Sequence, residues 1–256
     1  MLYFFLWCIY IGEQCRIIGR TGGIMKDFLK KYSHAWTLFY AFVYLTWWGM
    51  LGKMVMDQYS PVHMALDDKI PFCEWFIIPY YIWFPYILIV IAYFFFFAKR
   101  REYYQLTAFL FIGMTIALIT YTVWPNGITF RPELKELGRE NILIDLTAFI
   151  YANDRAINCC PSIHCFNSIG VCVAINNCAS LKHNKVVRIG SIILSTLICL
   201  STVFVKQHSV LDVIWALVLG AVMYLAAYLI PDLLLARKKK SEMAHTAGQV
   251  SEGLTD

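Results

Sequence analysis

The sequence predicts an all-α membrane protein, a polytopic bundle of six transmembrane helices with both termini in the cytoplasm. Hydrophobic residues make up 59% of the 256 residues and charged residues only 15%, whereas soluble domains carry about 25% charged residues. The apolar residues also form long runs separated by charges and turns. The aromatic residues lie inside these runs and not along a basic stripe, which excludes nucleic-acid binding.

Six segments have the roughly 20 mainly apolar residues that a spanning helix needs. Pro79 and Pro85 interrupt the second, which a membrane helix tolerates where neighbouring helices satisfy the freed carbonyls. The fourth is the most polar, and we expect it inside the bundle because polar side chains at depth usually face other helices. The segments are residues 35–54, 76–98, 104–124, 165–181, 186–205 and 209–230.

This pattern predicts three parts: an N-terminal cytoplasmic or interfacial segment at 1–34, a six-helix membrane domain at 35–231, and a basic, disordered cytoplasmic tail at 232–256. The first eleven residues are apolar but too short to span, and they lack the basic start of a signal peptide. They are interpreted either as a segment at the membrane interface or as residues that precede the native start codon. In the second interpretation, residues up to 24 do not belong to the native protein.

The orientation follows from the basic residues, which mark the cytoplasmic side of a membrane protein. Basic residues cluster before the first segment, between the second and third, between the fourth and fifth, and after the sixth. With six spans these four regions share one face. The connections at 57–74, 125–160 and 206–208 then face outward. We therefore expect an extracytoplasmic active site, most simply at the plasma membrane.

Two histidines stand at the outward ends of predicted helices. His208 and Asp212 are four residues apart at the start of the sixth, so they share a helix face. A carboxylate there can orient one imidazole nitrogen and leave the other free to attack phosphorus. His164 opens the fourth, where it can protonate a leaving alcohol as a general acid.

Candidate phosphate-binding groups surround these histidines. The backbone N–H groups at Ser162 and Ile163, at a helix N-terminus, suit a phosphate oxygen. Arg131 can clamp phosphate oxygens through paired hydrogen bonds. Lys206 is a further candidate for contacting the phosphate. Alternatively, its charge only anchors the end of the helix. Arg139 and Arg155 are alternatives for the role of Arg131.

Arg131-Pro132, Pro161-Ser162-x-His164 and Ser201 followed by His208-x-x-x-Asp212 resemble, in that order, the three motifs of the type-2 phosphatidic acid phosphatase/haloperoxidase superfamily. The resemblance covers residues 76–230. It implies that His208 is the nucleophile, that Asp212 orients it and that His164 is first the acid and then the base. It also implies phosphate binding by Arg131, Ser162 and Ile163, with no metal and no cofactor.

Three positions depart from the family pattern. Trp124 stands where the first motif has lysine, Thr202 where the third has arginine, and Ile163 where the second has glycine. With fewer cationic residues at the motif positions, the sequence resembles the inositol phosphorylceramide and sphingomyelin synthase branch. Enzymes of that branch act on a phosphodiester, which carries less charge than a monoester, and pass its phosphoryl group with the attached head group to a lipid alcohol. The retained motifs favour a lipid phosphatase that acts on phosphatidic acid or a related monoester. The branch-like features leave a lipid head-group transferase as the alternative.

The same sequence is also compatible with other classes of protein. Cys159, Cys160, His164 and Cys165 have the residue types of a zinc site but lack a second cysteine pair. Asp67 and Asp68 have the chemistry to bind a cation, but such a pair is more often part of a solvated loop, and they are interpreted in this way. A transporter or structural membrane protein is a further alternative, although the spans carry almost no charge at their midplanes. The expected partners are a lipid phosphate and the bilayer. The sequence leaves the oligomeric state open.

Overall fold

A computed structural model of the protein describes residues 30–53 and 59–252. The chain divides into two compact units, residues 1–39 and residues 40–256. The described part of the first unit contains a short 3-10 helix, η1 (Ser33–Leu38). Most of the N-terminal segment predicted at 1–34 therefore lies outside the described residues.

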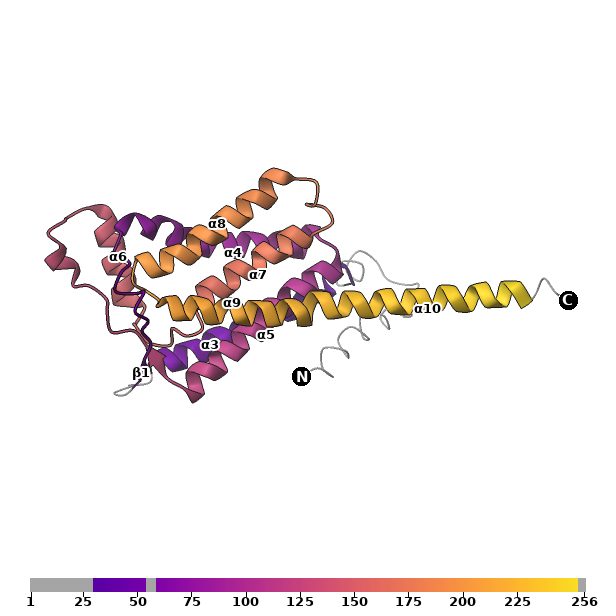
Figure 1. The fold of residues 1–256 in the computed structure, drawn as a ribbon, viewed down its shortest axis with the longest axis horizontal. Helices are drawn as coiled ribbons and strands as arrows, with labels where there is room; N and C mark the ends of the chain where they lie inside the picture. Colours follow the sequence, from indigo (N-terminus) through magenta and orange to yellow (C-terminus); the bar gives the residue numbers. More distant parts are fainter. Residues whose placement is uncertain (1–29, 54–58, 253–256) are drawn as a thin grey trace. The chain divides into compact units, whose positions relative to one another are not determined.

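The second unit is helical, and the all-α prediction is confirmed (Figure 1). The six predicted segments correspond to α3, α4, α5, α7, α8 and α9. A further helix, α6, lies in the connection between α5 and α7. The helices are α3 (Phe39–Lys53), α4 (Ile77–Phe97), α5 (Arg100–Val123), α6 (Ile142–Asn153), α7 (Ile163–Asn177), α8 (Lys185–Phe204), α9 (Val210–Tyr224) and α10 (Ile230–Glu252).

Four of these helices are long and apolar enough to cross a membrane: 74–97, 100–123, 185–204 and the continuous helix 210–243. By contrast, α3 and α7 have 15 residues each. A helix of that length measures about 22 Å, less than the roughly 30 Å of a bilayer core. The membrane character is therefore supported, whereas six complete spans and the orientation of the termini stay predictions.

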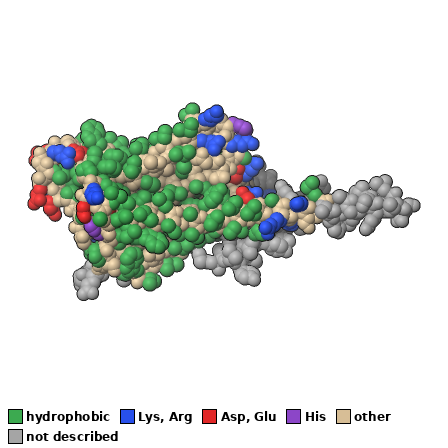
Figure 2. Space-filling view, viewed as in Figure 1, with side chains coloured by type: hydrophobic (Ala, Val, Ile, Leu, Met, Phe, Trp, Pro, Cys, Tyr) green, Lys and Arg blue, Asp and Glu red, His purple; other side chains and the backbone are tan. Residues whose placement is uncertain are grey.

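The surface of the bundle fits a lipid environment. Leu88, Ile89 and Phe97 of α4 expose 66% or more of their surface, and Val186 of α8 exposes 82%. Figure 2 shows hydrophobic side chains covering the visible face of the bundle, with basic side chains gathered near the start of α8. Such extensive exposed apolar surface is unfavourable in water and favourable against acyl chains.

Helix α7 lies at the centre of this bundle and packs against α4, α5, α8 and α9. Asn167 and Ser168 of α7 are buried, in agreement with the prediction that the most polar segment lies inside. Close approach requires glycine here: a Cβ at Gly113 of α5 would stand 2.0 Å from the Phe166 ring. Because the packing of α7 against four helices fixes this helix, its first residue, Ile163, is held at one end of the bundle.

The connection between α5 and α7, predicted as an outward loop, contains helix α6. The side chain of Asn141 caps this helix by accepting hydrogen bonds from the N–H groups of Leu143 and Ile144, at 2.9 and 3.1 Å. Its buried face, Ile144, Thr147 and Ile150, packs toward α4 and η2 (Glu74–Phe76). The sequence criterion missed α6 because its 12 residues are too short for a span.

Two short strands join the first and second outward connections: β1 (Ser60–Pro61) pairs in parallel with β2 (Asn126–Gly127). A further bridge links Gly127 to Ile157. These pairings hold the first and second outward connections together.

The C-terminal segment differs from the expectation of a disordered tail. A π-helical turn, η4 (Leu225–Leu229), continues α9 into α10, which is helical as far as Glu252. Leu, Ala, Arg, Lys and Glu dominate residues 233–243 and are strong helix formers. Pairs such as Lys238 and Glu242, 3.9 Å apart, lie one turn apart on the exposed helix.

Candidate active site

His208 lies in the tight connection between α8 and α9. Lys206 adopts a left-handed conformation with φ of 51°, which turns the chain back so that the N–H groups of Gln207 and His208 both donate to the carbonyl of Thr202, at 2.9 and 3.0 Å. Thr202 occupies the position at which the third motif has arginine. Its backbone carbonyl thus holds the connection that carries His208. His208 is held where α9 begins.

Asp212 lies in the first turn of α9 and is fully buried. Its Oδ2 atom is 3.1 Å from His208 Nδ1 and also accepts the N–H of Ser209 at 3.0 Å. The N–H of Ser162 donates to the backbone carbonyl of Asp212 at 3.2 Å. Asp212 therefore orients the imidazole and links the start of α9 to the start of α7.

The structure brings His164 to His208, as the sequence predicted. His164 Nδ1 lies 3.4 Å from His208 Nε2, on the side of the His208 ring away from Asp212. The His164 ring is enclosed by Tyr80 and Trp83 of α4, with centroid distances of 4.8 and 4.3 Å. Three groups thus form the series Asp212, His208, His164, in which Nε2 of His208 faces the second histidine.

Ser162 and Ile163 form the N-terminus of α7. Ser162 is fully buried, and its hydroxyl caps the helix by accepting the N–H of Cys165 at 3.3 Å. Ile163 and His164 line the cavity described below, whereas Ser162 does not. The Ser162 hydroxyl is thus committed to the helix cap, and the wall of the cavity at this point is formed by Ile163.

Asn126 holds the loop that precedes α7. Its Oδ1 atom accepts the N–H groups of Cys159 and Cys160 at 3.0 and 2.7 Å, and its Nδ2 donates to the carbonyl of Cys160 at 3.0 Å. Asn126 is fully buried. Sequence reasoning missed this residue because its partners are more than thirty positions away.

Arg131 reaches the site indirectly. Its guanidinium donates to the carbonyl of Asp154 at 2.8 Å and to the side chain of Gln207, the residue before His208. It also stacks 4.6 Å from the ring centroid of Tyr151. Of these residues, Gln207 and Asp154 line the cavity and Arg131 does not. Arg131 therefore stands behind the wall that carries His208.

The two alternative arginines are separated by the structure. Arg155 is exposed and lines the cavity. Arg139 instead forms an ion pair with the buried carboxylate of Glu74, at 3.1 Å. Arg155 is thus the arginine that the structure places on the wall of the cavity.

Lys206 is not brought to the two histidines. Its ammonium donates to the backbone carbonyls of Asp67 and Ile70, at 2.8 and 2.6 Å, and the residue is 7% exposed. The left-handed φ at Lys206 directs its side chain into the first outward connection. The alternative interpretation of this residue, as an anchor for the helix end, agrees with these contacts better than a phosphate contact does.

Asp67 was interpreted as a solvated loop residue, and this interpretation is wrong. Asp67 is 1% exposed, and its carboxylate caps α9. It accepts the hydroxyl of Ser209 at 2.6 Å and the N–H of Val210 at 2.8 Å. A carboxylate is favourable at a helix N-terminus, where N–H groups are unsatisfied. Asp67 thus fixes the start of α9 on which His208 and Asp212 depend.

A cavity of about 700 Å³ leads to the two histidines. His164, His208 and Asp154 lie on its polar part, and aromatic side chains such as Trp48, Trp83 and Phe84 line much of the rest. A mostly apolar wall with a few converging polar groups is typical of a small-molecule binding site. This cavity can hold a phosphate beside His208 and an apolar portion of a substrate along α3 and α4.

Several ionisable groups near the cavity have shifted pKa values. Burial, together with the charge of His208, lowers the pKa of His164 to about 3. Burial lowers the pKa of His208, but its hydrogen bond and charge interaction with Asp212 outweigh burial and bring the pKa above its ordinary value of 6.5. Burial raises the pKa of Asp154, against the opposing influence of His208 and Arg131. The proton on His208 is therefore held by the carboxylate beside it.

The comparisons with known proteins agree with this geometry. The family model of the PAP2 superfamily matches residues 132–234, a segment that contains His164, His208 and Asp212. No curated protein and no solved structure matches the chain. The resemblance to the type-2 phosphatidic acid phosphatase superfamily is thereby confirmed at the level of the superfamily. The matched segment contains helices α6, α7, α8 and α9, and members of this superfamily are phosphatases.

Proposed function

We propose that the protein is an integral-membrane lipid phosphatase that uses His208 as its nucleophile and needs no metal ion. The observation that carries the proposal is the series Asp212, His208, His164, with contacts of 3.1 and 3.4 Å, on the wall of a largely apolar cavity. The substrate class is a phosphate monoester of a lipid, such as phosphatidic acid. The active site faces away from the cytoplasm, at the plasma membrane.

In the first step, His208 Nε2 attacks phosphorus and the bond between phosphorus and the ester oxygen breaks. The negative charge of the bound phosphate raises the proton affinity of His164, which then donates a proton to the departing alcohol. Asp212 accepts the hydrogen bond from Nδ1 and stabilises the positive charge that develops on the ring. Because His164 Nδ1 lies 3.4 Å from His208 Nε2, a phosphate that binds to Nε2 displaces this contact.

In the second step, a water molecule attacks the phosphohistidine. His164, now unprotonated, accepts a proton from that water while the bond between phosphorus and Nε2 breaks. Inorganic phosphate leaves, and both histidines return to their initial states. The N–H groups at the start of α7 and the guanidinium group of Arg155 stabilise the negative charge on the phosphate oxygens, whereas Arg131 holds the loop of His208 through Gln207.

A second function is favoured by the small number of cations at the site. Lys206 bonds to backbone carbonyls, and Trp124 and Thr202 stand at two family cation positions. A phosphodiester carries less charge than a monoester and needs fewer cations. A lipid alcohol in place of water would then receive the phosphoryl group, and the protein would be a head-group transferase of the inositol phosphorylceramide or sphingomyelin synthase type.

One assay separates the two functions. Purified protein in detergent is supplied with phosphatidic acid in one reaction and with a labelled diester lipid plus ceramide or diacylglycerol in another. Release of inorganic phosphate that persists in EDTA and is blocked by vanadate supports the phosphatase. Transfer of the label to a new lipid supports the transferase. Loss of all activity on chelation would contradict the histidine mechanism in both forms.

A further inference from the structure

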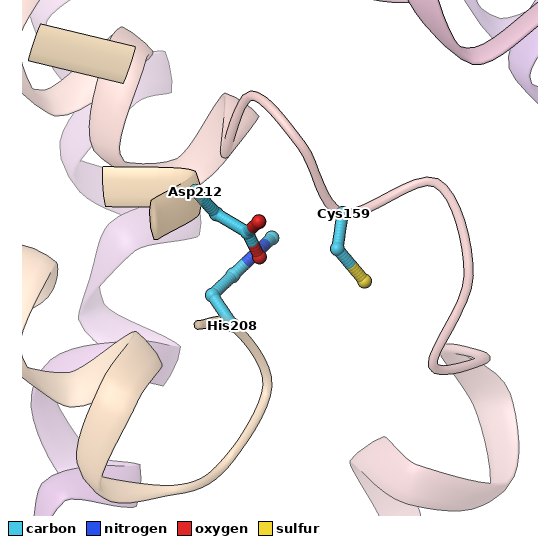
Figure 3. Close-up of side chains that lie close together, drawn as sticks. All are labelled: Cys159, His208 and Asp212. Carbon is cyan, nitrogen blue, oxygen red and sulfur yellow. The ribbon is translucent and has the colours of Figure 1, made fainter. Parts of the chain in front are cut away.

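Cys159 has no role in the proposed reaction, yet its thiol lies beside the reacting histidine. The residue is 3% exposed, in the loop that Asn126 holds before α7. One ligand atom each from Cys159, His208 and Asp212 lie within 4.8 Å of one another. Figure 3 shows His208 and Asp212 together on one segment and Cys159 on a separate loop beside them.

The three donor atoms are those that zinc prefers. Zinc binds thiolate, imidazole and carboxylate groups at about 2.0 to 2.3 Å in a tetrahedral arrangement, so that neighbouring ligand atoms stand roughly 3.4 to 3.8 Å apart. The observed separations reach this range if the side chains close by about 1 Å. Cys159 and His208 both line the cavity, which gives an ion access and leaves room for water as a fourth ligand.

Asp212 provides an independent indication. Its Oδ2 atom accepts the two hydrogen bonds described above, whereas its Oδ1 atom is buried and has no hydrogen-bond partner among the described residues. A buried carboxylate oxygen without a donor is energetically unfavourable. A cation between Asp212 and Cys159 would satisfy this oxygen.

We propose that Cys159, His208 and Asp212 form an inhibitory binding site for Zn²⁺ and other thiophilic divalent cations. On binding, the Cys159 thiol releases its proton to the solvent and coordinates as a thiolate. Coordination through His208 Nε2 occupies the attacking lone pair, and coordination through Nδ1 replaces the hydrogen bond to Asp212. Both arrangements suppress attack on phosphorus. The inhibition rests on the proposed function, whereas the binding does not.

Binding is tested without any enzymatic activity. The purified full-length protein is freed of metal with EDTA, desalted and titrated with Cd²⁺, whose bond to a thiolate absorbs in the ultraviolet. Wild type is compared with Cys159→Ser and Cys159→Ala, and with Cys73→Ser as a control because Cys73 lies outside the cluster. Variants are used only if they elute as wild type does in size-exclusion chromatography.

We expect both Cys159 variants to lose one saturable cadmium–thiolate absorption that the Cys73 variant keeps. Zn²⁺ should also raise the melting temperature of wild type more than that of either Cys159 variant, because a ligand that binds the folded state stabilises it. Identical cadmium spectra and identical zinc-dependent melting shifts in all four proteins would overturn the proposal.

Inhibition is tested in the phosphate-release assay, with each variant normalised to its own activity in EDTA. Loss of an outer-shell partner weakens metal sites by about 10- to 100-fold, so loss of the thiolate should raise the inhibitory Zn²⁺ concentration at least about tenfold. Mg²⁺ should not inhibit, because it prefers oxygen ligands. Equal zinc sensitivity in wild type and the Cys159 variants would contradict the proposal. Cadmium binding through Cys159 without turnover in EDTA would contradict the proposed function and leave the site standing.

Discussion

The Nδ1 atom of His208 lies 3.1 Å from Oδ2 of Asp212, and the same oxygen accepts the backbone N–H of Ser209. Asp212 therefore caps its own helix and orients the histidine with one oxygen atom. This double role ties the geometry of the candidate nucleophile to the folding of α9. A change at the start of α9 is expected to affect the reaction even where it does not touch the substrate.

The pH dependence of the reaction should report this pair. His208 must be unprotonated to attack phosphorus, and its pKa lies above 6.5 because the interactions with Asp212 outweigh burial. Activity is therefore expected to fall as the pH drops through a value above 6.5. In Asp212→Asn the carboxylate charge is lost, so this acidic limb should move to lower pH, and kcat should fall by about 10⁴-fold, as for the orienting carboxylate of other triads.

The same shift has a consequence for stability. A group with a raised pKa in the folded state binds its proton more tightly there than in the unfolded state. The contribution of the protonated His208 to stability is thus complete below the unfolded pKa and is lost as the pH rises through the folded pKa. The free energy of unfolding, measured in denaturant across this range, should show this loss in wild type and less of it in Asp212→Asn. An unchanged profile in the variant would contradict the assignment.

His164→Gln tests the general acid. Removing such a group typically costs about 10² to 10⁴-fold in rate. The decrease in kcat should be large for lipid substrates, because their alcohol needs a proton to leave. It should be smaller for an aryl phosphate, which has a good leaving group. His183→Gln is the matched control because His183 is exposed in the connection between α7 and α8. The same loss with both kinds of substrate would indicate a binding role for His164 in place of acid catalysis.

Asp67 and Asp68 offer an adjacent pair of carboxylates with different environments. Asp67 caps α9, whereas the Asp68 side chain is 64% exposed and pairs with His63. Loss of a helix cap costs about 0.5 to 2 kcal/mol. Asp67→Asn should therefore lower the melting temperature and kcat, and Asp68→Asn should leave both near wild type. Thermal unfolding and initial rates provide the measurement, and equal effects of the two substitutions would contradict the role assigned to Asp67.

The arginines can be ranked by their positions. Arg155 lines the cavity and Arg131 stands behind Gln207, whereas Arg139 pairs with Glu74. Arg155→Gln should raise KM, because an exposed guanidinium in the cavity attracts the phosphate before and during the reaction. Arg131→Gln should lower kcat through displacement of the His208 loop. Arg139→Gln is the control, and an equal increase of KM in this variant would argue against a specific role for Arg155.

Relationships between residues close together in the chain were predicted correctly from the sequence. Six apolar segments became six helices, and the i,i+4 spacing of His208 and Asp212 was enough to place both on one face. His164 followed from its position at the start of another helix. These features depend on neighbouring residues and on helix periodicity, which a sequence displays directly.

The remaining features depend on contacts between distant residues. Asp67 and Ser209 are 142 positions apart, and Asn126 and Cys160 are 34 apart. Lys206 is two positions from His208, yet a left-handed backbone turns its side chain away. A single sequence does not show which loops meet or where the backbone reverses. The cap on α9, the support of the Cys159 loop and the displaced lysine therefore came from the structure alone.

The central claim is that His208 carries the phosphoryl group, and trapping that intermediate tests it most directly. Wild type and His208→Ala are mixed with a radiolabelled lipid phosphate, quenched in alkaline denaturant during turnover, digested and mapped. The account predicts label on the peptide that contains His208, stable in base, released by acid and absent from the variant. Turnover without a labelled His208 peptide, or full activity in His208→Ala, would contradict it.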